Sequence, residues 1–483
     1  MKNQEKIKLK TPRPIEERRK IGWISFLIAL SVDVGAAVLF CIVYAFAVIG
    51  VGDFKTDSLK ELAAAFFILT QTYIVMYFYE RSVLKVLKNG VKKHIVSVAV
   101  SLFTLTVSVI LMKYVHEFFV PLAFMLLVTA TLSSARTAML NLLLIIFSLI
   151  FLVFNAGGQY GIEMGPALYG TLVNGICAML MVFSMFKSYK RIYVVLLNAG
   201  FSLIGAGFAF LYGLLSNQIN AEATGWLLLS NIASVTVFML LIPVLEKIFD
   251  ICTDLRISEF LTLKNSVLRQ LQEKAPGTYN HSLMVATLAE SCAEAIGENP
   301  LMARAAAYYH DVGKIKAPEF FSENQFDGYN PHDELPPEVS ANKITAHTKN
   351  GVQILKENGF PEELIRIAEE HHGNSPVGFF YYKAKTITED GNPEIDGYTY
   401  ENKKPSTKIS AIIMICDTVE SAVRANYEAD LKAYITRLVR DKIRLGQFDE
   451  CDISFQDVDT IINTLADIIP QVFHSRIKYQ KES

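Results

Sequence analysis

The first half of the chain consists of long apolar runs separated by short polar stretches. A bilayer core takes about 20 apolar residues per helix. Runs of this length predict eight spans, at 23–50, 61–79, 95–114, 118–134, 137–154, 167–186, 192–214 and 225–247. From about residue 250 onward charged residues become frequent, as in a soluble domain. The pattern therefore predicts a helical membrane domain over 23–248 followed by a soluble domain.

Apolar residues at helical spacing continue through the second half. They predict a connecting helix between Glu246 and Lys274, which we assign to 249–275, and pairing of this helix with a second copy is an open alternative. Pro276-Gly277 ends it, and Thr278 is expected to cap the next helix. Further helices are expected at 278–294, 300–311, 340–357, 361–372, 407–425 and 455–475, and an extended loop or hairpin at 375–406. The predicted fold class is all-α, with an all-helical soluble domain over 276–483.

Charges in the loops predict the orientation in the membrane. A basic tail over 1–22 carries eight Lys and Arg residues, and the loop 81–93 carries five more. The loops at 155–166 and 215–224 carry none. Since Lys and Arg are retained on the cytoplasmic side, an even number of spans places both the N-terminus and the soluble domain in the cytoplasm. We expect a multi-pass protein of the cell membrane.

Composition agrees with a membrane protein, because 51% of the 483 residues are hydrophobic. The lipid bilayer is therefore an expected partner, and a nucleic-acid polymer is not. The six cysteines are scattered without a CxxC pair, which excludes a zinc ribbon or a disulfide framework from the prediction. Asp33 lies inside the first span, where a carboxylate is costly. It belongs to a transport or sensing path or, as we favour, is protonated or hydrogen-bonded at a helix contact.

Imidazole and carboxylate side chains recur on the predicted helices of the soluble half. The set is His281, His310, Asp311, His347, His371, His372 and Asp417. Imidazole and carboxylate without thiolate favour ions such as Mn, Fe or Zn. Two ions about 3.5–4 Å apart can clamp a phosphodiester and activate water near neutral pH, and Asp311 has two oxygens with which to bridge them. Buried histidines are also common as hydrogen-bonded core residues, so spacing alone leaves both interpretations open.

Longer motifs around these residues resemble the HD-superfamily phosphohydrolases. They are EKAPGTYNHSLMV at 273–285, AYYHDVGK at 307–314, PEFFSENQ at 318–325 and NPHD at 330–333. The chain more narrowly resembles the membrane-bound seven-transmembrane-receptor HD family, whose members are cyclic-di-AMP phosphodiesterases. The resemblance covers nearly all of 248–475 and, more loosely, the spans from residue 61 onward. Where that family usually carries a large extracellular domain, only a short loop at about 51–60 is found here.

The resemblance implies a metal-dependent enzyme that hydrolyses cyclic di-AMP to linear pApA and so lowers the level of this bacterial second messenger. It implies two divalent ions, Mn or Fe, with the ligands His281, His310, Asp311 and Asp417 for one and Asp311, His347, His371 and His372 for the other. Asp311 and Lys314 would be catalytic, with Lys314 neutralising charge on the phosphate. Arg424 would contact a phosphate or form a structural ion pair, and Asn330 and His332 would line the substrate mouth or cap a helix.

Other functions stay open. The domain could bind a nucleotide as a receptor without hydrolysing it, or hydrolyse another nucleotide or dinucleotide. The Gly-Tyr-Pro signature of related cyclic-di-GMP enzymes is absent after His371-His372, where the chain reads GNSPVGFF. A transporter is a third alternative, which eight spans and Asp33 would fit, although no broken-helix pattern supports it.

Overall fold

The computed structural model describes residues 15–50, 54–82, 92–156, 162–185, 191–215, 221–249, 251–325, 328–387 and 393–472. The chain folds as two compact units, which divide between Leu255 and Arg256. Both units are built from helices, and the backbone pairing outside helices in the described part is one antiparallel bridge between Pro376 and Thr399. The all-α prediction is confirmed.

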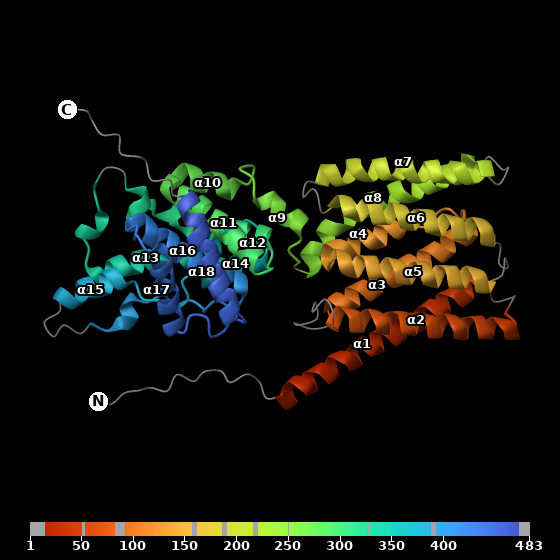
Figure 1. Ribbon diagram of the computed structural model, residues 1–483, viewed down its shortest axis with the longest axis horizontal. Coiled ribbons are helices and arrows are strands. Elements are labelled where there is room, and N and C mark those ends of the chain that lie inside the picture. Colours follow the sequence, from red (N-terminus) through yellow and green to blue (C-terminus); the bar gives the residue numbers. More distant parts are fainter. Residues whose placement is uncertain are drawn as a thin grey trace. The chain divides into compact units, whose positions relative to one another are not determined.

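The first unit is a set of long helices that lie side by side (Figure 1). Their bounds are α1 (Ile15–Tyr44) with a π-helical turn η1 (Ala45–Ile49), α2 (Thr56–Ser82), α3 (Lys92–Tyr114), α4 (Leu122–Leu132), α5 (Ala135–Ala156), α6 (Met164–Met185), α7 (Arg191–Leu215) and α8 (Ala221–Phe249). Helix α1 begins within the basic tail expected over 1–22, and residues 1–14 lie outside the described part. Seven of these helices are long and apolar enough to cross a membrane.

The surface of this unit is apolar and its interior holds polar groups. Large side chains such as Phe67, Leu203 and Leu240 are more than half exposed. Asn174 and Asp33 are instead buried between helices. This distribution suits a protein surrounded by lipid, because polar groups there find partners only inside the bundle.

The span expected over 118–134 is wrong as a membrane-length helix, because α4 has only 11 residues. Pro121, which has no N–H to donate, stands at its N-cap, and the backbone before it is not helical. Non-helical backbone at membrane depth needs partners inside the protein. Asn174 of α6 supplies one, because its Nδ2 donates to the carbonyl oxygen of Phe118 at 3.0 Å.

The second unit is a cluster of shorter helices (Figure 1). The α-helices are α9 (Asp254–Phe260), α10 (Ser266–Lys274), α11 (Pro276–Ala295), α12 (Pro300–Tyr309), α13 (Pro337–Glu357), α14 (Glu362–Glu370), α15 (Gly378–Ile387), α16 (Lys408–Ala425), α17 (Leu431–Arg444) and α18 (Phe455–Val472). A 3-10 helix, η4 (Val312–Lys316), follows α12, and η5 (Pro318–Phe320), η6 (Ser322–Asn324), η7 (Pro331–Asp333) and η8 (Ile395–Tyr398) lie in the connections. Helices α11 and α16 pack against each other and against α12, which makes them the centre of the unit.

The connecting helix expected over 249–275 is wrong as a single helix. Helix α8 ends at Phe249, and two short helices, α9 and α10, follow it. Asn265 interrupts the periodicity by capping α10, since its Oδ1 accepts from the backbone N–H of Val267 at 3.0 Å. The apolar face of α10 is buried in the second unit at Leu268 and Leu271. Pairing of this segment with a second copy stays a prediction.

Two helices of the second unit were not expected. Helix α15 lies inside the stretch 375–406, and α17 lies in a stretch for which no element was predicted. In the stretch 375–406, where an extended loop or hairpin was expected, only the two ends pair as in a hairpin. Val377 donates to the carbonyl of Tyr398 at 2.7 Å, and Tyr400 donates to the carbonyl of Ser375 at 3.1 Å. These contacts hold Tyr400 beside the histidines at the end of α14, as its ring distance of 4.4 Å to His372 shows.

Candidate metal centre

Seven side chains from five helices meet inside the second unit. His281 lies in α11, His347 in the middle of α13, and Asp417 in α16. The other four follow the ends of two helices, with His310 and Asp311 after α12 and His371 and His372 after α14. All seven residues predicted from the sequence are therefore brought together, and their donor atoms form two groups that share Asp311.

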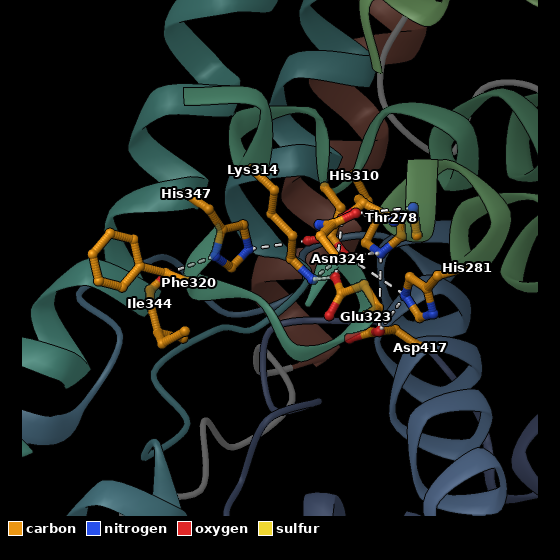
Figure 2. Close-up of polar contacts among 12 residues, drawn as sticks. Thr278, His281, His310, Lys314, Phe320, Glu323, Asn324, Ile344, His347 and Asp417 are labelled. Carbon is orange, nitrogen blue, oxygen red and sulfur yellow. Dashed lines mark hydrogen bonds and ion pairs between the residues drawn. The ribbon is translucent and has the colours of Figure 1, made fainter. Parts of the chain in front are cut away.

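The first group surrounds one oxygen of Asp311. The Oδ2 atom lies 3.2 Å from Nε2 of His310 and 3.6 Å from Nε2 of His281. Asp417 closes this group, because its Oδ1 lies 3.1 Å from the same nitrogen of His281. Figure 2 shows His281, His310 and Asp417 close to one another, from α11, the end of α12 and α16.

The second group surrounds the other oxygen of the same carboxylate. Oδ1 of Asp311 lies 3.2 Å from Nε2 of His347 and 3.6 Å from Nε2 of His371. His372 completes the group and presents Nδ1, which lies 3.8 Å from Oδ2 of Asp417. Because each oxygen of Asp311 serves one group, this residue has the geometry of a bridge between two ions.

Backbone carbonyls fix the orientation of three of the histidines. Nδ1 of His310, His347 and His371 lies 2.7, 2.7 and 2.8 Å from the carbonyl oxygen three residues earlier in each case. A carbonyl only accepts, so Nδ1 donates to it and Nε2 is the nitrogen that faces the cluster, where its lone pair can bind an ion once this nitrogen has lost its proton. The sequence places these rings at helix ends or along a helix, where the carbonyl of residue i−3 is always available.

Glu420 has a similar role that sequence analysis missed. Its Oε2 accepts from Nδ1 of His281 at 2.5 Å, and its side chain is buried. Carboxylates that orient a metal-binding imidazole also raise its basicity. The signal was present in the sequence, because Glu420 follows Asp417 by three residues on a buried helix face.

Gly313, two residues after Asp311, lies against the backbone of α13. A Cβ at this position would lie 1.9 Å from the carbonyl oxygen of His347 and 2.5 Å from the backbone nitrogen of Gly351. Only a residue without a side chain lets η4 approach the backbone of α13 this closely. The approach brings His347 within reach of Asp311.

Lys314 is half-buried, and its side chain reaches the cluster. Its Nζ lies 2.8 Å from Oδ2 of Asp311 and 2.8 Å from Oε1 of Glu323 (Figure 2). Glu323 is held in turn by Thr278, whose hydroxyl donates to it at 3.0 Å. Lys314 therefore places a positive charge beside the shared carboxylate.

The first turn of α11 is capped from outside the helix. The helix begins at Pro276, so the expected cap at Thr278 is wrong, and Thr278 lies inside the first turn. Oδ1 of Asn324 accepts from the backbone nitrogens of Gly277 and Thr278 at 2.9 and 3.1 Å. The segment PEFFSENQ therefore fastens the helix that carries His281.

The three residues predicted to contact the substrate, besides Lys314, each contact nearby parts of the chain. They are Arg424, Asn330 and His332. Arg424 pairs with Glu420 and lines a cavity of about 290 Å³ together with His281 and Lys314. Oδ1 of Asn330 accepts from the backbone nitrogen of His332 at 3.2 Å, which is the capping alternative. Nε2 of His332 lies 2.8 Å from the carbonyl oxygen of Phe320. Substrate contact by these residues stays a prediction.

The protonation of the metal-free cluster reflects a competition between burial and charge. Burial lowers the pKa of His310, but Asp311 and Asp417 outweigh it and raise this pKa to about 10. Burial keeps the pKa of His371 low, at about 4, because Asp311 compensates only in part. The pKa of Asp311 is well below its ordinary value, since His310 and Lys314 overcome the effect of burial. In the absence of metal, protons on the first group take the place of cations.

The donor set fits a pair of divalent ions. Three buried atoms that face the cluster, Nε2 of His281, Nε2 of His310 and Oδ1 of Asp311, lack a hydrogen-bond partner in the described part of the chain. Buried polar atoms are rarely left without partners. Imidazole and carboxylate atoms at this spacing could satisfy that need by binding metal, and the absence of thiolate suits borderline or hard ions.

Part of the chain is similar to known proteins. The HD domain family matches residues 278–422. The chain is 43% identical over 257 residues to the cyclic-di-AMP phosphodiesterase PgpH of Bacillus subtilis (strain 168), which covers 52% of this chain and 35% of that protein. It is 40% identical over 307 residues to the PgpH of Listeria monocytogenes serotype 1/2a (strain 10403S), covering 61% and 42%. Residues 278–422 therefore match an HD domain, and the chain is similar to these cyclic-di-AMP phosphodiesterases over at least half of its own length.

The HD-domain chain spans less than half the length of both curated relatives. A crystal structure of the L. monocytogenes PgpH HD domain in complex with cyclic-di-AMP is 44% identical, with a TM-score of 0.42. The match covers 44% of this chain and 100% of the crystallised one. Within the HD domain, all seven clustered residues fall inside the family match at 278–422.

Proposed function

We propose that this protein is a membrane-anchored, divalent-metal-dependent phosphodiesterase that hydrolyses cyclic di-AMP to linear pApA and thereby lowers the level of this second messenger. The observation that carries the proposal is the shared carboxylate of Asp311, whose two oxygens face two separate groups of donors. The names of the curated relatives support the choice of substrate.

His281, His310, Asp311 and Asp417 would hold one ion, and Asp311, His347, His371 and His372 the other. We propose Mn or Fe, because the donors are five imidazoles and two carboxylates. Such a pair supplies Lewis acidity and makes a water nucleophile available near neutral pH.

The chain's own residues would orient and neutralise the reacting groups. Lys314 is close to the bridging carboxylate, so its ammonium can offset negative charge that develops on a phosphate oxygen. Arg424 lies at the mouth of the cavity beside His281 and is the candidate for a second phosphate contact. Its pairing with Glu420 means that a substrate phosphate would have to share this guanidinium with a carboxylate.

We further propose that the N-terminus and the HD domain are cytoplasmic, as the basic loops predict. Glu117 accepts from the backbone nitrogen of Glu163 at 3.3 Å, so residue 117 lies at the start of α6. Helix α4 ends beside the start of α5, which is 22 residues or about 33 Å long. The non-helical segment before α4 and α4 itself would therefore make the fourth crossing together. The number of crossings would then stay even.

The test is hydrolysis by the full chain in lipid nanodiscs with Mn²⁺ and cyclic di-AMP, with products separated by chromatography. We expect pApA from the wild type and none from the double variant His310→Ala/Asp311→Ala. Asp449→Asn is the matched control, because this carboxylate lies in the same unit and pairs with Lys404 at 3.5 Å. Unchanged turnover in the double variant contradicts the enzyme, and tight binding without product favours a receptor.

A panel of cyclic and linear dinucleotides under the same conditions tests the substrate. Cyclic di-AMP is expected to have the highest kcat/KM of the panel. A higher value for another dinucleotide would leave the phosphodiesterase in place and overturn the proposed specificity.

A further inference from the structure

Three ionisable side chains are buried where α1, α2 and α3 meet. Asp33 belongs to α1, Glu80 to α2 and His94 to α3, and each is at most 1% exposed. Nε2 of His94 lies 3.0 Å from Oδ1 of Asp33, and its Nδ1 lies 2.9 Å from Oε2 of Glu80. One imidazole is therefore held between two carboxylates from different helices. Asp33 is thus hydrogen-bonded at a helix contact, which is the interpretation favoured from the sequence.

This arrangement does not suit a metal ion. The two ring nitrogens of an imidazole point in different directions, and each already has a carboxylate oxygen as its partner. The carboxylates of Asp33 and Glu80 consequently lie on opposite sides of the ring of His94. Their oxygens do not converge on one point, which is what a coordinated cation requires.

The two hydrogen bonds determine how many protons the cluster holds. Each nitrogen–oxygen contact carries one proton, whether it resides on the ring of His94 or on the facing carboxylate. Two carboxylates and one imidazole that share two protons have a net charge of −1. The charge is the same for an imidazolium between two carboxylates and for a neutral imidazole beside one carboxylic acid.

Within the described residues, the neighbouring elements supply little charge to offset this −1. Tyr77 of α2 packs its ring against His94 at 5.3 Å, and its hydroxyl accepts from Arg81 at 2.9 Å. Helix α5, which packs against α2 and α3, has Arg136 as its one ionisable residue, and Arg136 is exposed. Helix α4 and η1 contain no ionisable residue, and Lys113, at the far end of α3, donates to the carbonyl of Val48. A negative charge buried among apolar helices is costly.

One oxygen is available to remove that charge. Oε1 of Glu80 is buried without a hydrogen-bond partner in the part of the chain that the structure describes. The hydroxyl of Tyr73, two turns earlier on the same face of α2, is likewise buried and without a partner there. Protonation of a buried carboxylate removes the cost of burying its charge, and an oxygen without a partner can take that proton.

We propose that the Asp33–His94–Glu80 cluster is a proton-binding site of the membrane domain, which takes up one further proton on the carboxylate of Glu80 and becomes neutral. The proton comes from water and no bond other than O–H is formed. Glu80 stands two residues before the end of α2 and His94 two residues after the start of α3. The proton therefore exchanges with the aqueous side on which the chain passes from α2 to α3.

The alternative is a permanent clamp, in which the same contacts hold three helices together with a constant number of protons. Infrared difference spectroscopy of the full chain in nanodiscs separates the two, because only a protonated carboxyl group has a high-frequency carbonyl stretch. Between about pH 8 and pH 5 we expect such a band to appear in the wild type and to be absent in Glu80→Gln. Glu117→Gln, a carboxylate of the same unit outside the cluster, is the matched control and should retain the band.

Isotope labelling decides the question should Glu80→Gln fail to assemble. In the wild type, ¹³C-glutamate should shift the titrating band and ¹³C-aspartate should leave it in place, and Glu80→Asp should show the reverse. A titrating band that Glu80→Gln retains, or a wild type without any label-sensitive band over this pH range, would overturn the proposal and leave the clamp.

Discussion

At the scale of single residues, the site depends on side chains that act through others. Asp311 faces both donor groups, but its position follows from neighbours such as Lys314 and Gly313. His281 is aligned by Glu420, which lies 139 residues later in the chain. Such partners decide whether the donor atoms meet within metal-binding distance.

Glu420→Gln tests this dependence. An amide can accept from Nδ1 of His281, but it lacks the charge that raises the basicity of the imidazole. We expect metal affinity of the first group to fall by about 10–100-fold, measured by competition with a chromogenic chelator. Glu290→Gln is the control, since Glu290 pairs with Arg304 at the surface. Equal affinity in both variants would contradict a role for Glu420.

At the scale of elements, close contact between η4 and α13 brings the two donor groups together. Gly313 and Gly351 meet across this contact. The positions are not equivalent, because a Cβ on Gly351 would find its nearest neighbour, the backbone nitrogen of Gly313, at 3.4 Å. That distance is an ordinary van der Waals contact, whereas a Cβ on Gly313 would collide with the backbone of α13.

Gly313→Ala should therefore displace α13 and with it His347. We expect a loss of about 1–3 kcal/mol or more in the free energy of unfolding and loss of metal binding by the second group, measured by denaturant titration and calorimetry. Gly351→Ala is the matched variant and should be neutral or stabilising by up to about 1 kcal/mol. A tolerated Gly313→Ala would show that the close approach is not required.

An ion pair joins the starts of α16 and α18, and it should make the free energy of unfolding depend on pH. Nζ of Lys408 lies 2.8 Å from Oδ2 of Asp457, which also accepts from the backbone nitrogen of Ser454. Burial raises the pKa of Asp457, but Lys408 and Ser454 together outweigh it and lower this pKa below the ordinary value. The stabilisation is therefore present above the unfolded-state pKa and is lost as the pH falls through the lower folded-state value.

Asp457→Asn should lower the free energy of unfolding by about 1 kcal/mol near neutral pH. The difference from the wild type should shrink below about pH 4, because Asp457 becomes neutral in both states. Urea titrations of the second unit over a pH series measure this difference in the free energy of unfolding. Asp441→Asn, an exposed carboxylate beside Arg444, should have little effect at any pH. A constant difference down to the lowest pH would exclude the ion pair as its source.

At the scale of the whole molecule, the division between Leu255 and Arg256 separates the two kinds of chemistry. The buried ionisable groups of the first unit sit between membrane-length helices, whereas the metal-ligand candidates lie within the second. The second unit has its own buried helices, α11 and α16, so it contains what a domain needs to fold alone.

Residues 256–483 should therefore fold as an isolated domain that metal stabilises. Ligand at 100 times its Kd adds about 2.7 kcal/mol per site, which corresponds to a rise in Tm of roughly 5–10 °C for a domain of this size. Thermal unfolding with and without Mn²⁺, and after chelation, measures the shift. The Asp311→Asn variant should lose most of the Mn²⁺-dependent rise in Tm, and the Asp449→Asn variant should retain it. A wild-type Tm that does not respond to Mn²⁺ would contradict the metal site.

Much of the architecture was predictable because hydropathy and helical periodicity are local properties. Helices α11, α13, α16 and α18 were expected close to their observed bounds. The failures have physical causes. Pro121 breaks an apolar run that is otherwise long enough to span, and Asn265 caps a new helix inside a periodic stretch. Helix α17 was missed although its buried residues Leu431, Tyr434, Ile435 and Val439 follow helical spacing.

The sequence by itself determined the fold class and the division into a membrane half and a soluble half, because these follow from residue types and their local spacing. It also indicated the seven residues of the cluster, through the resemblance of the motifs around them to a known family. Only the tertiary structure decided which oxygen of Asp311 faces which histidines, that Glu420 aligns His281, and that Asp33, Glu80 and His94 form one cluster. Such contacts join residues tens to more than a hundred positions apart. Their partners are chosen by helix packing, which the local pattern of the chain does not encode.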